Sequence, residues 1–183
     1  MGFSTGQVGV YYPSDWPGMG STGTTLGGAI DSGRPALLSL NTGVFATGAS
    51  SFAGGADHIR YSKLFIRHDG ASTNTISNPT IYITNTTFSD QVTVAPDPYY
   101  LNTAYGAQTG TSAGRAFIPG GLNTTHFSGY TASTPLRIAS LARGDIKLSS
   151  GDNIGIWLKL TVPPGLPNSA DNTFSIVFLS TVS

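Results

Sequence analysis

The sequence predicts an all-β protein, an antiparallel β-sandwich of the jelly-roll type, and three observations lead to this fold class. Apolar and polar side chains alternate in several short segments, which is the spacing of half-buried strands. Charged residues make up only 10% of the chain and Glu is absent, so residues that build helix surfaces are scarce. Glycine (24) and proline (11) are frequent, which favours turns and loops. The 183 residues suffice for one such domain.

The most regular alternation lies near the C-terminus. From Ile154 to Val162 every second residue is apolar, and these side chains share one face. Trp157 lies on the opposite face, where we expect it to cap a second core or to contact a neighbouring subunit. A second apolar segment covers residues 173–180. We expect the two segments to pair as an antiparallel hairpin, with the second strand in a central position.

Four more strands are expected between residues 58 and 140. They are Ile59–His68, Thr80–Thr84, Gln91–Ala95 and Leu136–Ile138. The first ends at the turn dipeptide Asp69-Gly70. Its apolar positions change parity along the segment, which indicates either burial on both faces or a β-bulge.

The chain divides into residues 1–57, an irregular Gly/Ser/Thr-rich N-terminal arm with short strands, and residues 58–183, the β-sandwich domain. The arm holds 13 of the 24 glycines. Val8–Tyr12 is expected to form a short strand that stops at Pro13, whereas Asp15–Gly33 has neither helical nor strand periodicity. We interpret that stretch as an arm or surface excursion that another surface holds in place.

Composition and charge exclude several classes of protein. Nine basic residues balance nine acidic ones, and a chain without a basic footprint is not expected to bind nucleic acid. No apolar run approaches the ~18 residues of a membrane span, so no membrane contact is expected. Cysteine is absent, which excludes disulfides, Cys-zinc sites and thiol catalysis.

Two glycine patterns match known motifs, but their surroundings do not fit. Gly18-x-Gly20-x-x-Gly23 has the spacing of a dinucleotide site without the strand before it and the helix after it. Gly110-x-Ser112-x-Gly114 has the spacing of a nucleophile elbow but lies in a polar loop. We therefore predict no catalytic residue, and the chain is not expected to be an enzyme.

The histidines give no metal site. His58, His68 and His126 lack the His-x-His spacing that places ligands on one face of a strand. Calcium bound by Asp side chains and loop carbonyls stays an alternative, although no loop has the Asp-x-Asp spacing of calcium motifs. No cofactor is predicted.

Five aromatic residues are the candidate partner-binding residues. Tyr11, Tyr12 and Trp16 lie in the arm between prolines, and Tyr99 and Tyr100 follow a Pro-Asp-Pro segment. Large aromatics on irregular segments often serve to be buried against a partner. Packing inside the chain itself is the alternative for all five.

Several short stretches carry a resemblance. They are Leu26-Gly27-Gly28-Ala29-Ile30, Tyr61, Phe65-Ile66-Arg67, Gly144-Asp145-Ile146, Ser150-Gly151-Asp152 and Ile156-Trp157-Leu158-Lys159-Leu160-Thr161-Val162-Pro163-Pro164-Gly165. Together they resemble a group of small β-sandwich proteins encoded among the virion structural genes of tailed bacteriophages. That group usually has two adjacent basic residues before Thr-Val-Pro, and here Lys159 is followed by Leu160.

The resemblance implies a virion structural protein that is made in the host cytoplasm and lies on the capsid surface. Its implied role is capsid decoration (cement), with the major capsid protein as partner and no catalytic residues. A tail-fibre or baseplate module with a carbohydrate-binding face is the alternative, with Tyr99 and Tyr100 among the aromatics that would stack on sugars. Because Lys and Glu normally protect strand edges and are scarce here, we also expect a homo-oligomer, with a trimer favoured.

Overall fold

The computed structural model describes residues 8–15, 25–36, 58–70, 75–84, 92–96, 108–109, 127, 129, 131–137, 139–140, 144–145, 147–162 and 175–182. These residues form strands, turns and bends but no helix, which confirms the predicted all-β class. The strands are β1 (Val8–Asp15), β2 (Thr25–Pro35), β3 (His58–His68), β4 (Ile76–Thr84), β5 (Val92–Pro96), β6 (Gln108–Thr109), β7 (Leu136–Arg137), β8 (Ala139–Ser140), β9 (Gly144–Asp145), β10 (Lys147–Leu148), β11 (Asn153–Val162) and β12 (Ser175–Val182).

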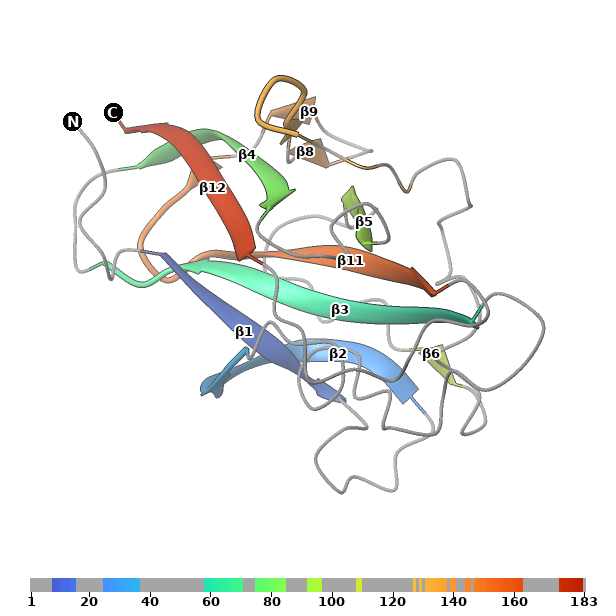
Figure 1. Ribbon diagram of the computed structural model, residues 1–183. Helices are drawn as coiled ribbons and strands as arrows, with labels where there is room; N and C mark the ends of the chain where they lie inside the picture. Colours follow the sequence, from blue (N-terminus) through green and yellow to red (C-terminus); the bar gives the residue numbers. More distant parts are fainter. Residues whose placement is uncertain are drawn as a thin grey trace.

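The strands form two main antiparallel sheets (Figure 1). The first sheet has the order β5-β11-β3-β1-β2-β6. The second has the order β10-β4-β12, and β7 also pairs with β4. β8 and β9 form a separate two-stranded ladder. Figure 1 shows β3 and β11 side by side across the middle of the molecule, with β4 and β12 above them.

The main hydrophobic core combines side chains from both sheets. Its buried members from β11 and β4 are Ile154, Ile156, Leu158, Leu160, Ile76, Ile81 and Ile83. None of these side chains is more than 8% exposed. Complete burial of one Leu or Ile stabilises a fold by about 1.5–3 kcal/mol, so this shared core holds the layers together. The apolar face predicted for β11 is the face that enters this core.

A second cluster lies on the other face of the six-stranded sheet. It consists of Tyr61, Ala95, Phe127 and Trp157, with Ile59 packed against it. The rings of Tyr61 and Phe127 are 5.4 Å apart between centroids and tilted by 57°, a common aromatic packing geometry. β3 is therefore buried on both faces, which is one of the two explanations predicted for its change of parity. Trp157 caps this second core.

The predicted hairpin between β11 and β12 is wrong. β11 pairs along its whole length with β3, from Asn153 opposite Arg67 to Val162 opposite His58, and its other edge pairs with β5. β12 pairs with β4 in the second sheet and lies at the edge of that sheet, not in a central position. The alternation showed which side chains share a face, but the hydrogen-bonding neighbours of a strand depend on the whole sheet.

The N-terminal region contributes two strands to the six-stranded sheet, and this corrects two of the predicted boundaries. β1 continues through Pro13 to Asp15, with register shifts against β2 on both sides of Pro13. β2 spans Thr25–Pro35, where the sequence showed no strand periodicity. Apart from Ala36, the remainder of residues 1–57 lies outside the described residues, so the arm itself stays a prediction.

β4 contains a bulge that lies between the residues that pair with β7 and those that pair with β10. Thr80 lies opposite Leu179, but Ser77 lies opposite Thr181, so β4 has one residue more than β12 in this interval. Asn78 has a φ of +51° there. β7 pairs on one side of this bulge and β10 on the other, and because β12 occupies the opposite edge, both lie along the same edge of β4.

Candidate functional site

The structure separates the two tyrosines that the sequence placed together. Tyr12 faces the main core and is 6% exposed. Tyr11 is its neighbour in β1, so it faces the opposite side of the sheet, where it is half-buried. Tyr12 is thus a residue of the chain's own core, as the alternative of internal packing requires. Trp16, Tyr99 and Tyr100 lie outside the described residues, and the partner contact of Tyr11, Trp16, Tyr99 and Tyr100 stays a prediction.

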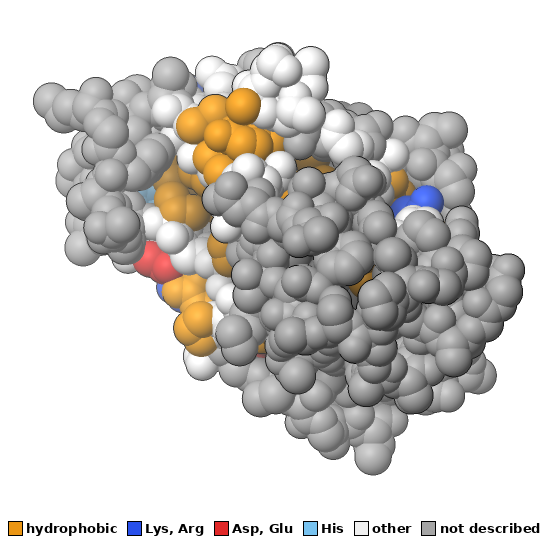
Figure 2. Space-filling model, viewed as in Figure 1, with side chains coloured by type: hydrophobic (Ala, Val, Ile, Leu, Met, Phe, Trp, Pro, Cys, Tyr) orange, Lys and Arg blue, Asp and Glu red, His pale blue; other side chains and the backbone are white. Residues whose placement is uncertain are grey.

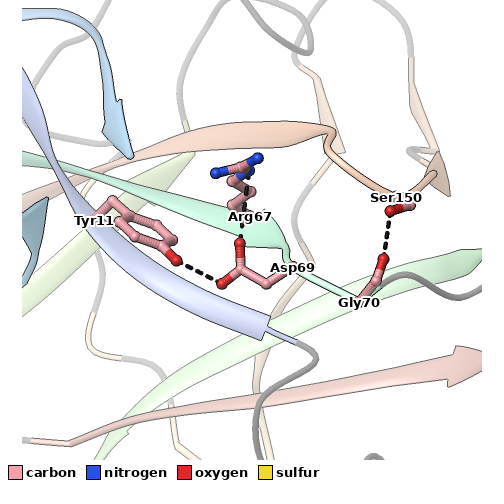
Figure 3. A network of polar contacts seen from close by, with 5 residues as sticks. All are labelled: Tyr11, Arg67, Asp69, Gly70 and Ser150. Carbon is pink, nitrogen blue, oxygen red and sulfur yellow. Dashed lines mark hydrogen bonds and ion pairs between the residues drawn. The ribbon is translucent and has the colours of Figure 1, made fainter. Parts of the chain in front are cut away.

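Tyr11 belongs to a small polar cluster at one end of the six-stranded sheet (Figure 3). Its hydroxyl donates a hydrogen bond to Asp69 Oδ2 at 2.7 Å. Arg67 Nε lies 3.6 Å from Asp69 Oδ1. Asp69 follows β3 directly, at the dipeptide where the sequence predicted the strand to end, and so the cluster joins β1 to the end of β3. A Cβ atom at Gly9 would collide with Asp69 Oδ2 and would lie 2.5 Å from Tyr11 Cε2, so a larger residue at that position would force these two side chains to shift.

The cluster stabilises the protonated form of the Tyr11 phenol. The hydrogen bond to Asp69 is the main cause of the raised pKa of Tyr11, burial and the negative charge of Asp69 add to it, and Arg67 opposes it. In the second core, burial raises the pKa of Tyr61. A tyrosine with a raised pKa acts at neutral pH as a hydrogen-bond donor and not as a base or nucleophile. The hydrogen bond between Tyr11 and Asp69 links β1 to the end of β3.

A second set of contacts fixes the turn before β11 to the end of β3. The Ser150 hydroxyl donates to the carbonyl oxygen of Gly70 (Figure 3). The amide of His68 donates to Asp152 O at 3.0 Å, and the amide of Gly151 donates to His68 O at 2.9 Å. Gly151 has a φ of +87°, a conformation that glycine tolerates best. The Ser150-Gly151-Asp152 stretch on which the resemblance partly rests is thus a structural turn.

Lys63 is a buried charged residue that the sequence reasoning did not single out. Its side chain is fully buried, and its Nζ lies 4.8 Å from the ring centroid of Phe65 and 5.4 Å from that of Trp157. Trp157 is also its direct cross-strand neighbour in β11. These are cation–π geometries, which partly replace the lost hydration of the ammonium group. The available signal was a lysine in the middle of a strand that is apolar on both faces.

No reaction centre is visible in the described part of the chain. No group of three or more His, Asp or Glu side chains that could hold a metal ion occurs among these residues. His68 is 1% exposed, and its Nδ1 has no hydrogen-bond partner in the structure. No helix among the described residues has the length and apolar character to cross a membrane. Both glycine motifs lie outside the described residues.

Among the described residues, the most accessible apolar feature is strand β12, at the edge of the second sheet. Leu179 is 46% exposed, and its neighbours Val177 and Ser180 are half-buried. In Figure 2 hydrophobic side chains gather over the area where Figure 1 draws β4 and β12. Leu179 thus places an exposed apolar side chain at the edge strand of the second sheet.

Comparison of the chain with protein-family models, with curated proteins and with solved structures gave no match.

Proposed function

We propose that the chain is a non-enzymatic structural protein of a virus particle, a capsid decoration protein that binds the shell of major capsid protein and stabilises it. One observation carries the proposal: the long-range polar contacts at the end of β3 join it to β1 and to the turn before β11. Tyr11 donates a hydrogen bond to Asp69, and Ser150 donates one to the carbonyl oxygen of Gly70. A β-sheet protein that uses its polar groups in this way fits a role in repeated surface contacts and not in catalysis. The resemblance to virion proteins of tailed bacteriophages points the same way.

The proposal includes a sandwich of jelly-roll type. From β3 onward the chain crosses repeatedly between the two sheets: β3, β5 and β11 belong to the first, and β4, β10 and β12 belong to the second. The earlier strands β1 and β2 lie in the first sheet together with β3. A jelly roll is a double-sheet fold whose connections cross repeatedly between its layers, and it is common in capsid proteins. The pairing β3–β11–β5 in one layer, with β4–β10 in the other, supports this arrangement.

The proposal is tested by co-sedimentation with undecorated capsids, together with the copy number of the chain per particle. We expect saturable binding, and a copy number comparable to that of the major capsid protein. Capsids that already carry their full complement are the control and should bind no more. Absence of binding, with only a few copies per particle located at the tail, would overturn the proposal and favour the tail-fibre or baseplate alternative.

A variant of this assay tests the predicted aromatic contact. Deletion of residues 1–33 removes β1 and most of β2, so it damages the sheet and is a poor test. Trp16→Ala changes one side chain outside the described strands and is the better choice. We expect it to weaken capsid binding without a change in melting temperature, because a central aromatic contact is worth about 2 kcal/mol or more.

A further inference from the structure

The edges of the two sheets differ in length and in composition. β6, β7 and β10 each have two residues, and β10 includes the exposed Lys147. β5 has five residues and ends at Pro96. β12 has eight residues, Ser-Ile-Val-Phe-Leu-Ser-Thr-Val, with neither a charge nor a proline. Natural proteins usually shorten an exposed edge or place Lys or Pro on it, and β12 has none of these protections.

The main core is less well covered at β12 than one strand further in. On β4, Ile81 is fully buried and Ile83 is 8% exposed. On β12, their cross-strand neighbours Phe178 and Ile176 pack against the same core but are only half-buried. On the outer face Leu179 is 46% exposed. Apolar side chains of both faces of β12 thus remain accessible, and an additional strand beside β12 would cover them.

The backbone of β12 defines the kind of partner that fits. The Thr80 hydroxyl donates to the carbonyl oxygen of Leu179 at 3.4 Å, so the backbone groups of Leu179 face β4. Those of the next residue, Ser180, consequently face the outer edge. Among the described residues β12 pairs with β4 alone. An edge of this kind is completed by another extended strand, through main-chain hydrogen bonds.

We propose that β12 pairs antiparallel with β12 of a second copy of this chain, so that the second sheet continues across the dimer. The strand is uncharged, so two copies of it meet without charge repulsion, and its apolar residues on each face meet apolar residues of the same face in the copy. Contact of one edge with the same edge is two-fold and closes at two copies. The expected oligomer is thus a dimer, in place of the trimer expected from the sequence. This association does not depend on the proposed capsid role.

The first test is the mass of the full chain in solution, without capsids, over a range of concentrations. We expect a dimer that dissociates on dilution. Leu179→Lys places like charges close together across the pair and should raise the dimer dissociation constant about tenfold or more. Ala132→Lys adds the same charge at an exposed residue of a turn region and should have no effect. Since Leu179 is exposed, the circular dichroism spectrum of Leu179→Lys should match that of the parent chain.

A second measurement does not depend on destabilising the dimer. The chain has no cysteine, so Leu179→Cys introduces the only thiol. A short thiol-to-thiol cross-linker should join two copies of this variant, and it should leave Ala132→Cys monomeric on a denaturing gel. A monomer at every concentration would overturn the proposal. A trimer would also overturn the proposal. So would a dimer that Leu179→Lys does not weaken and that Leu179→Cys does not cross-link, because the contact would then lie elsewhere. Capsid binding is read in the separate co-sedimentation assay, so the two proposals fail independently.

Discussion

Packing of the six-stranded sheet on both of its faces is tested most directly at Trp157. This side chain is 1% exposed and belongs to the second core, whereas its neighbour Leu158 is fully buried in the main core. A buried Trp removes roughly 150–250 Å² from water, worth about 4–6 kcal/mol at ~25 cal/mol per Å². Truncation to Ala retains part of this area and also removes the ring beneath Lys63 Nζ. We therefore expect Trp157→Ala to lower the free energy of unfolding by about 4 kcal/mol.

The matched control is Leu158→Ala, on the opposite face of the same strand, with an expected loss of about 3 kcal/mol. Both variants are measured by urea denaturation, followed by far-ultraviolet circular dichroism at one protein concentration. A contribution of the second core to folding is refuted if Leu158→Ala lowers the free energy of unfolding by about 3 kcal/mol while Trp157→Ala lowers it by less than about 1 kcal/mol. Trp157 would then cover a surface that contributes little to folding, and its contact with a neighbouring subunit would become the better explanation.

Three further predictions concern the turn before β11 and the Tyr11 cluster. Gly151→Ala should destabilise the fold by about 1–2 kcal/mol through its positive φ alone, since a Cβ there meets no atom within 4 Å. Gly129→Ala also adds a methyl group in open space, without a positive φ, and should change thermal stability by less than about 0.5 kcal/mol. Tyr11→Phe should cost about 1 kcal/mol through loss of one hydrogen bond. Above pH 10.0 the unfolded chain releases the phenolic proton of Tyr11 before the folded chain does, which lowers the free energy of unfolding as the pH rises. Tyr11→Phe should therefore make this decrease smaller. Urea unfolding between about pH 8 and about pH 11 measures both effects. Gly9→Ala should displace Asp69 from Tyr11, and an ultraviolet titration should then show the pKa of Tyr11 moving back toward 10.0. An unchanged titration would mean that the hydrogen bond survives the added methyl group.

The contacts of Tyr11, Tyr12 and Leu179 could not be predicted from the sequence. Partner contact was predicted from the aromatic character and position of Tyr11 and Tyr12, but the two side chains point to opposite faces once their segment is a strand. The tie between Tyr11 and Asp69 joins residues that are 58 positions apart. The exposed edge at Leu179 depends on which strand lies beside β12. None of these relations is visible in the spacing of residues along the chain.

The sequence by itself determined the all-β class and the approximate location of β3, β4, β5, β11 and β12, and for β3 it left burial on both faces and a β-bulge as alternatives. These properties follow from local alternation and composition, because a strand must place its apolar side chains on a buried face. Only the tertiary structure decided which strands are neighbours. β2 includes the weakly patterned Gly27-Gly28 pair, which lacks side chains to mark a face, and its place in the sheet comes from pairing with β1. β11 and β12 carry equally strong patterns but belong to different sheets, since the pattern defines a buried face and main-chain hydrogen bonding across the whole sheet selects the partner.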